Sequence, residues 1–308
     1  MREIQEAALV GLGAIGAVVA PALLNVLGEE RFYVVAAGAR KARLEAGTRI
    51  NGACCRFPVR EPSAATRADL VVFAVKNTQL EGAMEDAAGA VGEGTVILPL
   101  LNGIVSEELL RARFPQAHVL TAVVRVPSTN LNGEIAWPVG RERISLGEER
   151  NDTLTPEVRA VLDLLGRGGL RCDVPADMVR DQWVKFMANV SENQVAAVMG
   201  ATYGDIQKSQ HLQELCRMVA REVIAVARRA GVDLTEADQE AREDYLMTLR
   251  PEGKPSTLQD VEAGRRTEVD FFGGTVVALG ERYGVETPYN KFLYHAIHAL
   301  EERAGGKA

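Results

Sequence analysis

The chain has 308 residues, more than one hydrophobic core usually organises, so its length favours two domains with a cleft between them. Hydrophobic residues make up 47% of it without an apolar run long enough to cross a membrane, a composition typical of water-soluble globular proteins. The formal net charge of -7, with no basic stripe interleaved with aromatics, argues against a nucleic-acid partner.

The first residues, Met1 to Glu6, carry both charge signs and lead into an apolar run, without the features of a secretory signal. No two of the four cysteines have the two-residue spacing of a zinc or redox motif, and the four histidines form no plausible metal-ligand set. The cysteines are Cys54, Cys55, Cys172 and Cys216. We therefore predict a cytoplasmic protein with reduced thiols, no bound metal and no membrane partner.

Short apolar runs alternate with helix-like stretches in the N-terminal half. The runs are Ala7–Val10, Tyr33–Ala37, Leu70–Val75, Thr95–Leu98 and Val119–Val124. They are continuous rather than alternating in polarity, as expected of parallel strands covered on both faces. This pattern predicts a doubly wound α/β sheet.

The pattern changes after residue 131. Asn132-Gly133 is a two-residue turn signal, and strand-like stretches follow at Glu134–Trp137 and Arg143–Leu146. We expect an antiparallel hairpin here that extends the sheet.

The strand signals end after a helix-like stretch, Thr155–Leu165, and a last strand, Leu170–Val174. From Pro175 the sequence has helical periodicity throughout. The predicted helices begin near Asp177 and continue over Gln213–Ala230, Glu236–Thr248, Leu258–Tyr283 and Pro288–Arg303. We therefore predict a dinucleotide-binding domain over residues 1–174 and an all-helical domain over 175–308.

A glycine-rich motif follows the first predicted strand and opens a helix. It reads Gly11-Leu12-Gly13-Ala14-Ile15-Gly16. In a Rossmann domain the first glycine permits a tight turn, the second lets the backbone approach the pyrophosphate, and the third allows close packing of the helix. The alternative is a plain turn of small residues. Pro21, inside the expected helix, predicts that the helix is kinked or shortened.

The end of the second strand bears on the choice of cofactor. A carboxylate there holds the ribose hydroxyls of NAD, whereas this strand leads into Gly38-Ala39-Arg40-Lys41. Arg40 can bind a 2′-phosphate with paired donors, and Lys41 or Arg43 can add charge, which predicts NADP rather than NAD. The alternative is that these three cations only form a solvated helix start.

Two further pairs of residues follow predicted strands. They are Lys76-Asn77 and Asn102-Gly103. Ligands bind at the carboxyl ends of strands in open α/β sheets, so Lys76 and Asn102 are candidate cofactor contacts, and Asn102 is also a candidate substrate contact. Ordinary loop chemistry explains each pair equally well.

The helix after Asp177 carries Lys185, Asn189 and Asn193 at four-residue spacing, which lines them along one face. Asp181 and Glu192 lie on or near the same stripe, so periodicity alone favours a plain solvent-facing surface. Two asparagines inside a helix are poor helix formers and suggest another role.

Several motifs, taken together, closely resemble those of the ketopantoate reductase family over nearly the whole chain. They are Gly11–Gly16, Ala74-Val75-Lys76, Leu101-Asn102-Gly103, Trp183-x-Lys185-x3-Asn189-x3-Asn193, Ser256–Asp260 and Gly264–Asp270. The resemblance implies a Rossmann domain followed by a helical domain, and NADPH-dependent reduction of 2-dehydropantoate (ketopantoate) to pantoate in pantothenate biosynthesis.

The same resemblance implies roles for individual residues. Lys185 corresponds to the family's general acid, and Glu268 to the glutamate that orients that lysine and the substrate. Ser256 corresponds to the residue that binds the substrate carboxylate, and Asn189 and Asn193 to asparagines that contact its polar groups.

The resemblance also places Lys76 and Asn102 in the active site. From the sequence alone, Glu268 fits equally well as half of a surface ion pair with Arg265. One departure concerns the substrate pocket, because Gly253 stands where the family often has asparagine.

We interpret the protein as a reductase of a small 2-oxo acid. The alternatives are a reductase of a different 2-oxo or 3-oxo acid, an NADP-dependent hydroxyacid dehydrogenase with the same architecture, or a catalytically silent dinucleotide sensor. The sequence leaves the oligomeric state open; a homodimer through the helical domain is one alternative.

Overall fold

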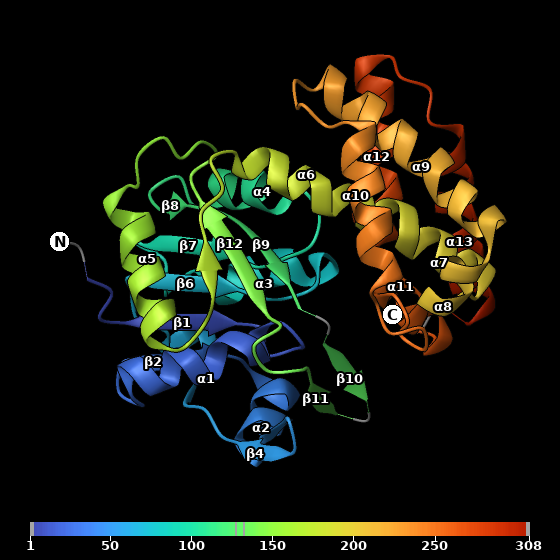
Figure 1. Ribbon diagram of the computed structural model, residues 1–308. Helices are drawn as coiled ribbons and strands as arrows, with labels where there is room; N and C mark the ends of the chain where they lie inside the picture. The colour runs from blue at the N-terminus through green and yellow to red at the C-terminus, as the bar shows by residue number, and fades with distance from the viewer. Residues whose placement is uncertain (1–2, 127, 132, 306–308) are drawn as a thin grey trace. The chain divides into compact units, whose positions relative to one another are not determined.

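The computed structural model describes residues 3–126, 128–131 and 133–305 (Figure 1). The chain divides into two compact units, Met1–Val179 and Arg180–Ala308. The first unit is built around a sheet and the second is helical, so the predicted fold class, a Rossmann domain followed by an all-helical domain, is confirmed.

The first unit contains a six-stranded sheet in the order β5-β2-β1-β6-β7-β8. Every neighbouring pair is parallel. The strands are β1 Ala7–Val10, β2 Phe32–Val35, β5 Val59–Arg60, β6 Leu70–Phe73, β7 Val96–Pro99 and β8 His118–Val119. This is the strand order of dinucleotide-binding domains, and the order reverses between β1 and β6, where such sheets bind ligands.

Helices cover both faces of this sheet (Figure 1). In β1, the side chains of Ala7 and Leu9 belong to the core on one face of the sheet, and those of Ala8 and Val10 to the core on the other. This is because successive side chains of a strand point to opposite sides. One core includes residues of α1 (Gly16–Leu27) and α5 (Pro156–Arg167), and the other includes residues of α3 (Leu80–Asp86) and α4 (Ser106–Arg113). Burial on both sides explains why the strands are continuously apolar.

Helix α1 runs on past Pro21 to Leu27, so the proline does not end it. Ala17, Val19, Ala20 and Leu23 of this helix are fully buried. Tertiary packing of this apolar face stabilises the helix against the loss of one backbone hydrogen bond.

The predicted hairpin forms, but it does not join the parallel sheet. β10 (Thr129–Leu131) and β11 (Glu134–Ala136) pair antiparallel; Asn132 of the predicted turn lies outside the described residues, and Gly133 has a φ of 82°. β11 pairs instead with β3 (Thr48–Ile50), which also pairs with β4 (Ala53–Cys55), and these four strands form a sheet of their own.

Arg143–Leu146 pairs elsewhere, as part of β12 (Arg143–Gly147). This strand is antiparallel to β9 (Thr121–Arg125) and parallel to β13 (Cys172–Asp173). β9, β12 and β13 form a three-stranded sheet of their own, although β9 follows β8 after a single residue.

The second unit consists of packed helices. Their bounds are α6 Met178–Ala188, η3 Asn189–Asn193, α7 Gln194–Met199, α8 Tyr203–Lys208, α9 Gln210–Arg229, α10 Glu236–Met247, α11 Ser256–Glu262, η4 Val269–Phe271, α12 Gly273–Tyr283 and α13 Pro288–Arg303. Gly284 ends α12 in the left-handed conformation and Pro288 opens α13, so these two helix ends lie at the predicted bounds, Tyr283 and Pro288.

The helix predicted over Leu258–Tyr283 is wrong as a single element. α11 ends at Glu262, Gly264 has a φ of 61°, and the chain returns to an α-helix only at Gly273. A residue with positive φ cannot continue a right-handed helix, so the chain leaves the helix axis at Gly264. Glu268 therefore lies in a short irregular segment rather than on a long helix.

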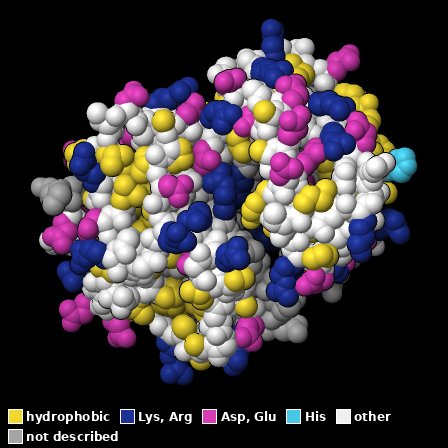
Figure 2. Space-filling model, in the orientation of Figure 1, with side chains coloured by type: hydrophobic (Ala, Val, Ile, Leu, Met, Phe, Trp, Pro, Cys, Tyr) yellow, Lys and Arg dark blue, Asp and Glu magenta, His cyan; other side chains and the backbone are white. Residues whose placement is uncertain are grey.

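The surface of the helical unit mixes both charge signs. Arg228 pairs with Glu236 at 2.7 Å and Lys254 with Glu262 at 2.6 Å. Figure 2 shows acidic and basic side chains interspersed over the visible face of this unit. In the described part of the chain, no helix has the length and hydropathy that spanning a membrane requires.

Candidate functional site

The glycine turn lies at the carboxyl end of β1, beside the end of β6. Gly11 has a φ of 96°, and a Cβ atom there would lie 2.6 Å from the Ala74 carbonyl oxygen and 2.6 Å from Val75 Cγ1. Register explains this contact, because Val10 pairs with Phe73 and the next residues along each strand are Gly11 and Ala74. Gly11 is thus required both by its backbone conformation and by the neighbouring strand.

Gly16 is required for a different reason. A Cβ atom at Gly16 would lie 2.0 Å from the Gly11 carbonyl oxygen, so the first turn of α1 can close onto β1 only without a side chain. Between these two glycines the chain turns through Leu12, Ala14 and Ile15, which are all half-buried.

Gly13 is explained by neither conformation nor packing. It is exposed, its φ lies outside the left-handed region, and none of the described atoms lies within 4 Å of the position that its Cβ would take. The absence of a side chain therefore leaves open space above the turn, where a ligand can approach the backbone. The first turn of α1 carries no acidic residue, so the positive end of its dipole favours an anion there. These features fit the pyrophosphate of a dinucleotide.

The cations predicted to select NADP lie at the start of a helix. β2 ends at Val35, earlier than predicted, and Gly38 begins α2 (Gly38–Ala46). Arg40 is exposed in the first turn, and its guanidinium lies 3.9 Å from the Asp86 carboxylate. Lys41 is engaged more closely, because its ammonium donates to Glu61 at 3.0 Å. Arg40 is therefore the less closely paired of these two cations.

Lys76 and Asn102 follow neighbouring strands, β6 and β7. Lys76 is half-buried and immediately precedes the short turn η2 (Asn77–Gln79). Asn77, only 3% exposed, donates from Nδ2 to the Asn102 carbonyl oxygen at 2.8 Å. This bond ties the two strand ends together and fixes the loop that carries the half-buried Asn102 side chain. The sequence did not predict this structural role for Asn77, and the only feature that pointed to it was the position of Asn77 after a strand.

In the helical unit, the chain from Met178 to Met199 is helical throughout, but it changes its winding at Asn189–Asn193, where η3 is a π-helical turn. In an α-helix a four-residue step overshoots a full turn by about 40°. A π turn takes up more residues, so the same step falls short. The angle around the helix axis therefore advances from Lys185 to Asn189 and turns back from Asn189 to Asn193. These opposite rotations keep the three side chains close to one line.

The solvent-facing interpretation of this helix is wrong. Lys185 and Asn189 are half-buried, and Asn193 and Glu192 are buried. Glu192 accepts two hydrogen bonds from Arg242 of α10, both at 2.6 Å. Burial lowers the pKa of Arg242, but the Glu192 carboxylate raises it by more, and burial raises the pKa of Glu192. The sequence could not reveal this partner, which lies 50 residues away.

Asn193 and Ser256 meet across two helices. The Asn193 Nδ2 atom donates to Ser256 Oγ at 3.3 Å, although the residues are 63 apart in sequence. Ser256 is the first residue of α11 and is exposed, whereas Asn193 is only 7% exposed. The contact places a buried amide beside an exposed hydroxyl.

Glu268 is 7% exposed, at the start of the 3-10 turn η4. The predicted alternative, a surface pair with Arg265, is wrong, because the Arg265 guanidinium donates to Asp260 at 2.9 Å. Lys185, Asn189, Asn193, Ser256 and Glu268 all belong to the helical unit.

The loop before Ser256 docks on the start of α8. The backbone N–H groups of Tyr203 and Gly204 donate to the carbonyl oxygens of Gly253 and Pro251 at 2.9 and 2.7 Å. A Cβ atom at Gly253 would lie 3.0 Å from both the Arg250 carbonyl oxygen and Tyr203 Cδ2. Close packing on Tyr203 thus explains the glycine at this position.

The four cysteines are free thiols. Within residues 3–126, 128–131 and 133–305, no three His, Cys, Asp or Glu side chains form a group that could hold a metal ion.

Comparison with known proteins identifies the family. The family model described as "Ketopantoate reductase PanE/ApbA" matches residues 7–151, and the one described as "Ketopantoate reductase PanE/ApbA C terminal" matches residues 177–301. The chain belongs to the ketopantoate reductase family. It is thus an oxidoreductase of that family, and the family resemblance predicted from the sequence is confirmed.

Individual relatives agree with this assignment. A 2-dehydropantoate 2-reductase of Streptococcus pyogenes serotype M1 is 30% identical over 256 residues, which cover 80% of each chain. The PanE/ApbA family ketopantoate reductase from Ralstonia eutropha JMP134 is 25% identical with a TM-score of 0.85, over 97% of this chain and 99% of that one. D-mandelate dehydrogenase, solved with NADH and anilino(oxo)acetate, has a TM-score of 0.87 at 22% identity, over 98% of this chain and 100% of that one. This last likeness is one of fold.

Proposed function

We propose that the protein reduces a small 2-oxo acid with NADPH, and that its substrate is ketopantoate, which it converts to pantoate. Family membership supports the reaction class, because relatives with that activity match most of the chain. The observation that carries the proposal is the contact between Asn193 and Ser256. It brings together two residues that the resemblance assigns to substrate binding, in the unit that also contains Lys185.

The glycine turn supports a dinucleotide cofactor. The open space at Gly13 and the unopposed positive end of α1 suit a pyrophosphate, and a protein of the same fold was solved with NADH. The choice of NADPH rests on Arg40, an exposed guanidinium at the start of α2, where a carboxylate would bind the ribose of NADH. Lys76 and Asn102, at the ends of β6 and β7, would contact the cofactor near its reactive ring.

A nicotinamide cofactor held by these residues would supply the hydride that C2 of the oxo acid accepts. The Lys185 ammonium donates a proton to the C2 oxygen, so that the ketone becomes a hydroxyl and the lysine is left neutral until it regains a proton from water. The positive charge also stabilises the negative charge that develops on that oxygen, and such acid catalysis contributes about 10² to 10⁴-fold.

Glu268 would orient the lysine and the substrate hydroxyl, because a flexible four-carbon stem positions its ammonium poorly without help. Ser256 would bind the substrate carboxylate, and Asn189 and Asn193 would contact the remaining polar groups. The burial of Glu268 and Asn193 suits this role, since hydrogen bonds made away from bulk water hold a ligand more firmly.

A direct assay tests the proposal. NADPH oxidation is followed at saturating cofactor with ketopantoate, and then with a panel of other 2-oxo and 3-oxo acids that includes phenylglyoxylate. We expect the highest kcat/KM with ketopantoate and a lower KM for NADPH than for NADH. A higher kcat/KM with another acid would replace the substrate. NADPH binding without turnover of any acid would favour a dinucleotide sensor.

A further inference from the structure

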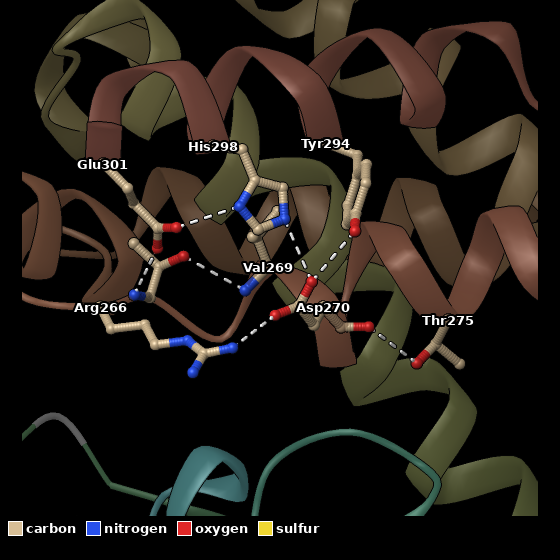
Figure 3. Close-up of polar contacts among 8 residues, drawn as sticks. Arg266, Val269, Asp270, Thr275, Tyr294, His298 and Glu301 are labelled. Atoms are coloured by element: carbon tan, nitrogen blue, oxygen red, sulfur yellow. Dashed lines mark hydrogen bonds and ion pairs between the residues drawn. The ribbon is translucent and has the colours of Figure 1, made fainter. Parts of the chain in front are cut away.

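A polar cluster on α13 holds the segment that contains Glu268. Figure 3 shows Tyr294, His298 and Glu301 on one side of this helix, facing Asp270. These three residues follow the helical spacing of three to four, so they share a face of α13. The cluster lies outside the glycine turn and does not include Lys185 or Ser256.

His298 lies between two carboxylates. Its Nδ1 atom is 3.1 Å from Glu301 Oε2, and its Nε2 atom is 3.1 Å from Asp270 Oδ1. The Tyr294 hydroxyl donates to the same Asp270 oxygen at 3.1 Å, and Arg266 donates to the other one at 3.3 Å. Burial and the adjacent Asp270 carboxylate raise the pKa of Tyr294, which keeps its hydroxyl in the donating form.

The contacts fall on both sides of Glu268 in the sequence. On one side, the Thr267 backbone N–H donates to Glu301 Oε1 at 2.7 Å. On the other side, Asp270 is held by His298 and Tyr294. Between them, Val269 is buried against Ala197 and Ile297. The backbone on either side of Glu268 is therefore fixed to α13 through polar contacts that converge on His298.

We propose that His298 is a positioning residue for Glu268, acting through Asp270 and Glu301. Within the irregular segment after Gly264, the Glu268 carbonyl oxygen accepts from the N–H groups of Phe271 and Phe272, and the side-chain contacts to α13 add to these bonds on both sides of Glu268. This inference rests on the proposed function, which gives Glu268 its role in orienting Lys185 and the substrate.

Each ring nitrogen of His298 faces a carboxylate. The imidazolium form donates to Asp270 and Glu301 together, whereas the neutral ring donates to only one of them. Charged and titratable groups near the ring include Asp270 and Arg266 from the irregular segment and Tyr294 and Glu301 from α13.

Three variants and a control test the proposal. His298→Ala removes both contacts. His298→Gln keeps a neutral donor near the Nε2 position, toward Asp270, and His298→Asn keeps one near the Nδ1 position, toward Glu301. The control is His295→Ala, on the same helix, because His295 is exposed and also contacts the Tyr294 ring.

For His298→Ala we expect kcat to fall by about tenfold or more, because a small misplacement of a positioned group costs that much, with the KM for NADPH unchanged. His298→Gln and His298→Asn should each restore part of kcat, and His295→Ala should behave as wild type. Hydrogen exchange should become faster in residues 266–271 of His298→Ala and remain unchanged in α9. Unchanged kcat and exchange in His298→Ala would overturn the proposal.

Comparison of the three His298 variants separates positioning from mere stability. Equal losses of kcat in all three variants that follow their thermal unfolding midpoints would overturn the proposal.

A further variant distinguishes the failure of this inference from failure of the proposed function. Glu268→Gln should lower kcat by itself, and His298→Ala should then add little to it, because both act through the same group. Normal kcat in Glu268→Gln would remove Glu268 from the proposed mechanism. A lowered kcat in Glu268→Gln with a fully additive effect of His298→Ala would leave that mechanism intact and overturn the positioning role.

Discussion

In the proposed mechanism, the glycine turn and the π-helical turn provide binding groups in opposite ways. In the first unit the turn offers backbone, its geometry depends on the absence of side chains at Gly11 and Gly16, and the open space above it depends on the absence of one at Gly13. In the helical unit the change in winding at Asn189–Asn193 presents side chains, and it depends on contacts made from other helices. A backbone-built site is damaged by adding atoms, whereas a side-chain-built site is damaged by removing them.

The two regions also differ in how their residues are held. The glycine turn is held by backbone packing between two parallel strands, where Val10 lies beside Phe73, 63 residues further along the chain. The π turn is held by side-chain contacts to Ser256 and Arg242, which are 63 and 50 residues away from the residues they contact. Substitutions of distant side chains should therefore affect the helical unit more.

The sharpest test of the side-chain-built site is Lys185→Ala. We expect kcat to fall by about 10² to 10⁴-fold, because the reaction loses both the proton donor and the positive charge. Binding of NADPH, measured by fluorescence titration, should stay the same, since the glycine turn is unchanged. Lys291→Ala, an exposed lysine on α13, is the control. Near-normal turnover in Lys185→Ala would exclude this residue as the acid.

Arg242→Ala tests the distant support of the π turn. It leaves the buried Glu192 carboxylate without its ion-pair partner, and we expect a loss of about 3 kcal/mol in the free energy of unfolding. Urea denaturation measures this loss. The exposed ion pair of Arg250 and Glu252 supplies the control, because Arg250→Ala should change the free energy of unfolding by less than about 0.5 kcal/mol. Equal losses in the two variants would show that the buried pair of Glu192 and Arg242 stabilises the protein no more than an exposed ion pair does.

Within the glycine turn, alanine substitutions should separate folding from binding. Gly16→Ala places a Cβ atom 2.0 Å from a carbonyl oxygen, and we expect a loss of about 3 kcal/mol in stability from this overpacking. Gly13→Ala meets no such contact, so thermal unfolding should be unchanged.

Gly13→Ala should instead weaken NADPH binding by about 10-fold or more, since hydrogen bonds to a charged ligand contribute about 1.5 to 3 kcal/mol. Calorimetric titration of the folded variant gives the dissociation constant. If Gly13→Ala bound NADPH as wild type does, the open space above the turn would have no part in cofactor binding.

Arg40→Ala tests the one side chain that the backbone-built site needs for specificity. We expect the KM for NADPH to rise by about tenfold with little change for NADH, because only NADPH loses a charge-assisted contact. Lys41→Ala should have a smaller effect, since Lys41 is already paired with Glu61. Arg49→Ala, another exposed arginine in the same unit, is the control. An unchanged preference would remove Arg40 from cofactor selection.

The sequence by itself determined the parallel sheet, the glycine turn and several helix ends. Continuous apolar runs occur where a strand is buried on both faces, and Gly284 and Pro288 act through their own backbone preferences. Such features are local, so they can be predicted without knowledge of the rest of the chain. The positive φ of Gly264 is of the same kind, and the helix predicted across it was wrong because its periodic pattern outweighed that glycine.

Only the tertiary structure decided the π turn, the partner of Glu192, the contact between Asn193 and Ser256, and the sheet that the hairpin joins. Each depends on which distant segment packs against a given face, and that choice is made by the burial and hydrogen bonding of the whole unit. A four-residue spacing could line up Lys185, Asn189 and Asn193, but it could not tell a solvent-facing stripe from a buried one. Whether the stripe is buried depends on the helices that pack around it, and the local sequence pattern does not reveal which helices those are.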